Sequence, residues 1–191
     1  MLYRANIELS LKMFAVIGVF DIILRNSIDR YMIAQKGPMW LEEAVAPAGY
    51  LVLHPGCERS FHAIQESIKI LGPQYCHENL IAKLSFGFWR HQFAGIEYVA
   101  ANCNLINIFF NRPPLIKQKD IYKRLMRINE IRNRIAHHEP ICFYGNLIST
   151  ANTEDRYHII LQLLHWLGCN PSKILYGIDK VSRSIYHIKS I

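Results

Sequence analysis

The sequence of 191 residues lacks the features that mark several large classes of protein. Its five cysteines are scattered singly with no Cys-x-x-Cys pair, which argues against a disulfide framework or a structural zinc site. We therefore expect free, mostly buried thiols. Glycine (10) and proline (8) are few, and 51% of the residues are hydrophobic. This composition excludes a disordered or low-complexity chain.

Long apolar runs are also missing. The longest one near the N-terminus, from Met13 to Phe20, ends at Asp21 and is far shorter than the roughly 20 residues that cross a bilayer. Glu8 and Lys12 precede this run and no small-residue cleavage pattern follows, so it does not read as a signal peptide. We expect a soluble, cytoplasmic protein without a membrane partner.

Acidic residues are fewer than basic ones. The formal net charge is +7 and the isoelectric point is about 9.2. Such a balance favours a polyanionic partner such as nucleic acid, but net charge alone does not identify a function.

The apolar residues recur at helical spacing along almost the whole chain, and no run alternates as a half-buried strand does. In the first helix, the repeating apolar positions are Leu11, Phe14, Ile17, Leu24 and Ile28. Expected helices cover about 3–34, 58–71, 78–84, 96–109, 118–138, 152–168 and 171–189, with an irregular connection at 36–56 and a loop at 140–150. The prediction is an all-α, single-domain helical bundle over residues 1–191.

The segment Arg132–Pro140 (RNRIAHHEP) holds the densest cluster of functional side chains. The helix leading into it has an apolar stripe that we expect to be buried, formed by Ile121, Leu125, Ile128, Ile131 and Ile135. Asn133 and His137 share the nearly opposite face, where we expect them to be accessible. Arg132 and His137 diverge by about 140° on an ideal helix. Their joint use requires the Arg132 side chain to bend round or a second copy of the helix, so we expect a homodimer.

From spacing alone, two interpretations of this cluster are open. Arginine and histidine in the last turn complement the helix dipole and need no function beyond that. Alternatively, a histidine that titrates near neutral pH and an arginine that grips phosphate oxygens are suited to phosphoryl chemistry on RNA.

A resemblance bears on this choice. The segment resembles the RNxxAHHEP signature of Abi-like (abortive infection) proteins of the HEPN superfamily of helical nucleases. Further blocks match in order: Phe20–Ile28 is similar to an "LRNAI"-like stretch, Gly37–Leu41 to "g..WL", Leu84–Trp89 to "LsFGFW", and His165–Leu167 to a late "Wi" position. Asp21 stands where the family often has Glu, and the region between Trp89 and Ile116, which contains the Asn-rich stretch 102–111, is loosely matched.

The resemblance implies a HEPN-like fold and a metal-independent endoribonuclease that needs no cofactor. In that chemistry the RNA 2′-hydroxyl attacks the neighbouring phosphate and leaves a 2′,3′-cyclic end. The implied catalytic residues are Arg132, Asn133 and His137. Arg134 and His138 are expected as secondary phosphate ligands.

Other polar residues have a functional and a structural interpretation. Lys119, Lys123 and Arg127 form part of a basic run that either guides an RNA backbone or is simply solvated. Asp21 and Arg25 form an intrahelical ion pair, or Arg25 and Asn26 support the polar groups of the Arg132 helix.

Two neighbouring features are expected to be structural. The aromatic cluster Phe86, Phe88 and Trp89 is expected in the core rather than as a base-stacking platform. His158 and His165 share a helical face without a third ligand at metal-binding spacing, so no metal site is expected.

Two functions remain open at this stage. The first is a homodimeric ribonuclease acting in abortive infection and phage defence or as a toxin, with RNA as substrate and an antitoxin or a phage-derived trigger as a further partner. The second is a catalytically inactive HEPN module that binds RNA or a protein such as an antitoxin.

Overall fold

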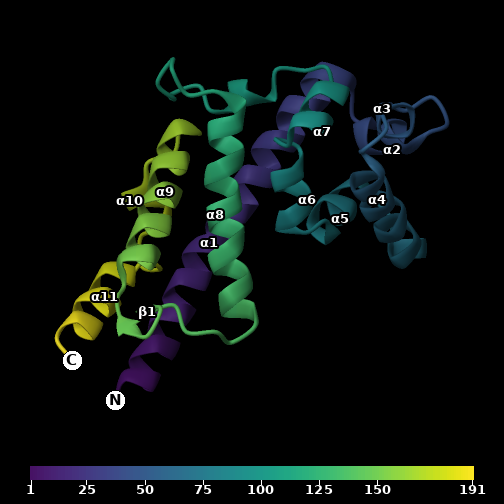
Figure 1. Cartoon of the computed structure of the whole chain (residues 1–191). Coiled ribbons are helices and arrows are strands. Elements are labelled where there is room, and N and C mark those ends of the chain that lie inside the picture. Colours follow the sequence, from purple (N-terminus) through teal and green to yellow (C-terminus); the bar gives the residue numbers. More distant parts are fainter. The chain divides into compact units, whose positions relative to one another are not determined.

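The computed structural model describes all residues, 1–191, and is helical apart from one small hairpin. Its contacts divide the chain into two compact units, residues 1–23 with 124–191, and residues 24–123. Helices α1 (Leu2–Lys36) and α8 (Gln118–Ala136), labelled in Figure 1, each have residues in both units. The all-α prediction is confirmed, whereas a single domain over residues 1–191 stays a prediction. No helix is both long enough and apolar enough to cross a membrane.

The first unit contains the start of α1, most of α8 and the C-terminal helices α9 (Ala151–Trp166), α10 (Pro171–Ile174) and α11 (Val181–Lys189). Its core includes Leu9, Met13, Val16, Phe20, Leu125, Ile128, Ile160, Leu163, Leu164 and Val181, all fully buried. Figure 1 shows α9 alongside α8 in this unit. Burial of this apolar surface is the main force that holds these helices together.

The second unit is built from shorter helices. They are α2 (Trp40–Val45), α3 (Tyr50–Leu53), α4 (Glu58–Leu71), η1 (Gly72–Gln74), α5 (His77–Lys83), α6 (Phe86–His91), α7 (Gly95–Ala100) and η2 (Leu105–Ile108). Its core is aromatic, with Trp40, Trp89, Phe93 and Phe109 fully buried. Phe86 and Phe88 are buried as well, which confirms the structural interpretation of that cluster.

The second unit contains two polar clusters, one partly buried and one buried. The Asp29 carboxylate accepts hydrogen bonds from Trp40 Nε1 and His77 Nε2, both at 2.8 Å. Glu97 is only 4% exposed, accepts from Ser60 Oγ at 3.3 Å and lies 3.5 Å from His91 Nδ1. Burial acts to raise the pKa of Glu97, but hydrogen bonds from His91, the backbone and Ser60 lower it below its ordinary value of 4.5.

Several element predictions were wrong in detail. The connection at 36–56 contains α2 and α3, and the loop at 140–150 contains a hairpin of β1 (Phe143–Tyr144) and β2 (Leu147–Ile148). The expected helix at 96–109 is broken after α7, where Asn102 is left-handed at φ 46°. The expected last helix is broken between α10 and α11, where Gly177 has φ 76°.

The five cysteines are all free, which agrees with the absence of a disulfide framework. However, only Cys57 and Cys142 are buried, Cys103 and Cys169 are half-buried and Cys76 is exposed. The expectation of mostly buried thiols was therefore wrong for three of them.

Candidate functional site

The helix that carries the RNRIAHHEP segment is amphipathic, as its sequence predicts. Ile121, Leu125 and Ile128 are fully buried and Ile131 is 4% exposed. Asn133 and His137 are exposed on the other face, which confirms their predicted accessibility. Ile135 is only half-buried, so the prediction of a buried stripe was wrong in the last turn, where the side chain lines a surface cavity instead.

The C-terminus of α8 is closed by a pair of backbone hydrogen bonds. The Glu139 N–H donates to Arg134 O at 2.8 Å, and the His138 N–H donates to Ile135 O at 3.0 Å. This pair of bonds is the Schellman motif, in which the residue that follows the helix C-cap adopts the left-handed conformation. That residue is usually glycine, but here it is His138, at φ 59°. A non-glycine residue in this conformation stores backbone strain beside the candidate site.

Arg132 and His137 do not meet within one chain. Arg132 is half-buried and its Nη1 donates to Asn133 Oδ1 at 3.4 Å. The His137 imidazole is exposed and has no hydrogen-bond or ion-pair partner in the chain. His137 is therefore open to a ligand or a second chain.

Arg134 is engaged inside the chain. Its Nε lies 3.3 Å from Glu139 Oε2, and its Nη2 donates to the Pro140 carbonyl oxygen. The positive charge of Arg134 is thus partly balanced within the chain. His138, the other expected phosphate ligand, is exposed.

The loop after the motif segment is fixed by two residues that the sequence analysis did not single out. The Ile141 N–H donates to Oδ1 of the buried Asn6, at 2.9 Å, and the Ile141 carbonyl accepts from Thr153 Oγ1, at 2.6 Å. Asn6 lies in α1 and Thr153 in α9, so both helices position the loop. No local sequence signal could have indicated these bonds, because Asn6 precedes Ile141 by most of the chain.

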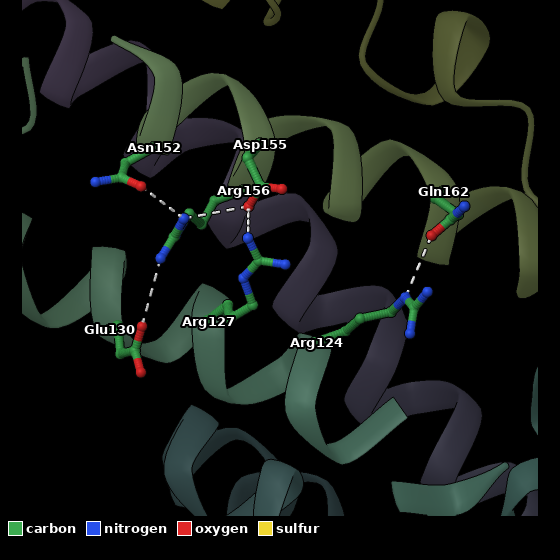
Figure 2. A network of polar contacts seen from close by, with 7 residues as sticks. All are labelled: Arg124, Arg127, Glu130, Asn152, Asp155, Arg156 and Gln162. Carbon is green, nitrogen blue, oxygen red and sulfur yellow. Dashed lines mark hydrogen bonds and ion pairs between the residues drawn. The ribbon is translucent and has the colours of Figure 1, made fainter. Parts of the chain in front are cut away.

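The basic residues upstream differ in their surroundings. Lys119 and Lys123 are exposed. Arg127 is ion-paired with Asp155 of α9, as Figure 2 shows, so its charge is already matched. In α1, Asp21 and Arg25 are half-buried and Asn26 is exposed; their supporting role stays a prediction.

An exposed apolar surface on α1 is the main feature that the sequence analysis missed. Leu11 and Phe14, expected on the apolar side of this helix, are 64% and 44% exposed, because the buried side is formed by Leu9, Met13, Val16 and Phe20. Leu11 and Phe14 line a cavity of about 460 Å³. The other lining residues are Tyr3, Asn6, Ile7, Ser10, Ile135, Ala136, His138 and Glu139. Apolar side chains of α1 therefore border the end of the motif segment.

No group of three or more His, Cys, Asp or Glu side chains is placed to hold a metal ion.

The chain matches no protein-family model, and comparisons with curated proteins and with solved structures find no match either.

Proposed function

We propose that this chain is an endoribonuclease of the HEPN type, acting in phage defence by abortive infection or as a toxin. The single observation that carries the proposal is the exposed, unpartnered imidazole of His137, which directly follows the helix that presents Arg132 and Asn133. The resemblance of the RNxxAHHEP segment supplies the reaction class. In the proposed reaction, the RNA 2′-oxygen attacks phosphorus, the bond to the 5′-oxygen breaks, and a 2′,3′-cyclic phosphate and a 5′-hydroxyl form.

Each side chain has a role that its chemistry suits. His137 moves the proton of the attacking or the leaving oxygen, since an imidazole exchanges protons near neutral pH. Arg132 stabilises the charge that develops on the phosphorane oxygens. Asn133 positions Arg132, because its Oδ1 accepts from Nη1.

The proposed active form is a homodimer in which Arg132 of one protomer and His137 of its partner complete a site. Two observations support it: no contact joins Arg132 and His137 within one chain, and an apolar surface with Leu11 and Phe14 exposed borders the motif segment. A two-fold axis would place the same surface of both protomers together and cover it.

The test uses purified protein and single-stranded RNA in EDTA. The proposal predicts cleavage products with 2′,3′-cyclic phosphate and 5′-hydroxyl ends. A substrate with 2′-deoxyribose at the cleaved nucleotide lacks the nucleophile and should remain intact. Binding of RNA without cleavage would instead favour the inactive HEPN module, as would binding of a protein partner only.

A further inference from the structure

The hairpin that follows the motif segment presents an aromatic side chain to solvent. Phe143 pairs with Ile148 and Tyr144 with Leu147 in an antiparallel register. Gly145, at φ 58°, makes the tight turn between the strands. Tyr144 is 69% exposed, although strand aromatics of a stable hairpin are normally packed against a neighbour. Its ring face is therefore free for a planar ligand.

A separate cavity of about 460 Å³ lies against this hairpin. It is lined by Tyr144 and Phe143, by Arg134 at the end of α8, and by the amide side chains of Asn146 and Asn152. Its volume falls within the range of about 300–1,000 Å³ that is usual for small-ligand pockets. The lining therefore combines two aromatic residues with two asparagines and contains no carboxylate.

The amide of Asn152 is held in one orientation. Its Oδ1 accepts from Arg156 Nη1 at 3.1 Å, and Figure 2 shows the amide nitrogen directed away from Arg156. Arg156 is itself held by Asp155 at 3.2 Å and by Glu130 at 3.7 Å, with its side chain 17% exposed. Asn152 lines the cavity, and its N–H groups make no hydrogen bond within the chain, so they are available as donors.

These groups favour a nucleobase over a phosphate. An aromatic ring stacks on a base of any kind, and an amide N–H reads acceptor atoms on the base edge. The one cation in the lining, Arg134, is paired with Glu139 and bound to the Pro140 carbonyl, so little net positive charge is left for an anion.

We propose that this cavity binds one nucleobase of the single-stranded RNA substrate, with Tyr144 stacking on the base and Asn152 donating to its edge. The inference rests on the proposed function, since it assigns the substrate's base to a pocket beside the motif segment. An unpaired strand is required, because the edge and face of a base in a duplex are not both accessible.

The test measures binding separately from cleavage. Fluorescein-labelled 2′-O-methyl oligonucleotides, which lack the attacking hydroxyl, are titrated with protein and followed by fluorescence anisotropy. Tyr144→Ala should raise Kd about 5- to 100-fold, the scale of one lost stacking contact. Tyr144→Phe should keep wild-type affinity. Tyr186→Ala is the matched control, because Tyr186 is 76% exposed on α11.

A second substitution tests the base edge. Asn152→Asp keeps an acceptor for Arg156 but removes the N–H donors. It should change the order of affinity among oligo(A), oligo(C) and oligo(U), whereas Tyr144→Ala should weaken all three. Equal affinities of Tyr144→Ala and wild type would overturn the proposal, as would tighter binding of duplex than of single strands.

The outcomes also separate this inference from the nuclease. If wild type binds RNA in a way that depends on Tyr144 but does not cleave it, the base-binding pocket is supported and the ribonuclease proposal is wrong. If cleavage depends on His137 but Tyr144→Ala changes neither Kd nor the positions of cleavage, the ribonuclease proposal is supported and the base-binding pocket is wrong. Absence of any binding to single-stranded RNA rejects both.

Discussion

Arg134 and Glu139 are joined twice, by a backbone hydrogen bond of 2.8 Å from the Glu139 N–H to the Arg134 carbonyl and by a side-chain ion pair of 3.3 Å. Together these contacts close the C-terminus of α8 and hold His138 in the left-handed conformation. The end of the motif segment is thus shaped by the chain itself, and the exposed His137 is presented from a fixed helix end.

Replacing His138 with glycine should stabilise the protein. The left-handed conformation costs a residue with a Cβ about 1–2 kcal/mol, and glycine avoids this cost. We expect His138→Gly to raise the free energy of unfolding by about 1 kcal/mol in urea titrations. His138→Ala is the control, because it removes the imidazole and keeps the Cβ. A glycine variant no more stable than the alanine variant would show that His138 is not strained.

The exposed apolar surface of α1 should carry the dimer contact. Leu11→Asp places a charge where the proposed interface must exclude water, so this variant should sediment as a monomer at micromolar concentration. Leu53→Asp is the control, because Leu53 is equally exposed, at 63%, in the other unit of the chain. A wild-type protein that is itself monomeric and fully active would contradict the dimer.

Mixing two inactive variants tests whether the site is shared. A heterodimer of Arg132→Ala and His137→Ala has one site with both native side chains and one site with neither. Random exchange makes half of the dimers mixed, so activity should return to about a quarter of the wild-type rate. If no activity returns although mixed dimers form, Arg132 and His137 act from the same chain.

The lysines and Arg127 should differ in RNA binding. Lys119→Gln and Lys123→Gln should each weaken binding and lower the slope of log K against log salt by about 1, because each neutralises one phosphate. Arg127→Gln should change neither quantity, because Arg127 is paired with Asp155. Equal salt slopes for all three variants would assign the lysines to a solvated face.

The buried Glu97 should make stability depend on acid pH. Its pKa in the folded protein is below 4.5, so the carboxylate contributes stability that is present above about pH 4.5 and is lost as pH falls through the folded pKa. Glu97→Gln should therefore be less stable than wild type at pH 7, and the difference should shrink in more acid solution. Urea midpoints across this pH range measure it, with the exposed Glu66→Gln as control.

The helical periodicity was sufficient to predict the fold class and the faces of α8. Leu125, Ile128 and Ile131 are buried and Asn133 and His137 are exposed because a helix of constant pitch fixes their directions. Ile135 is less buried than its position in the apolar stripe predicts. Burial also depends on which residues pack against each turn of the helix, and in the last turn of α8 Ile135 lines the cavity bordered by α1.

Periodicity could not reveal which apolar residues of α1 are covered. Leu11 and Phe14 repeat at helical spacing just as Met13 and Phe20 do, yet the former are exposed and the latter buried. The hairpin also escaped prediction, because strands of two residues are too short to show an alternating pattern. The long-range bonds of Asn6 and Arg156 depend on tertiary contacts and have no local sequence signature.

The most direct measurement compares wild type with His137→Ala on the same single-stranded RNA in EDTA. We expect cleavage by wild type, a loss of about 10²- to 10⁴-fold in His137→Ala, and no loss in His187→Ala, which removes an exposed histidine of α11. Equal cleavage by wild type and His137→Ala would rule out His137 as the catalytic acid or base, and a wild-type protein that binds the RNA without cleaving it would not be a ribonuclease.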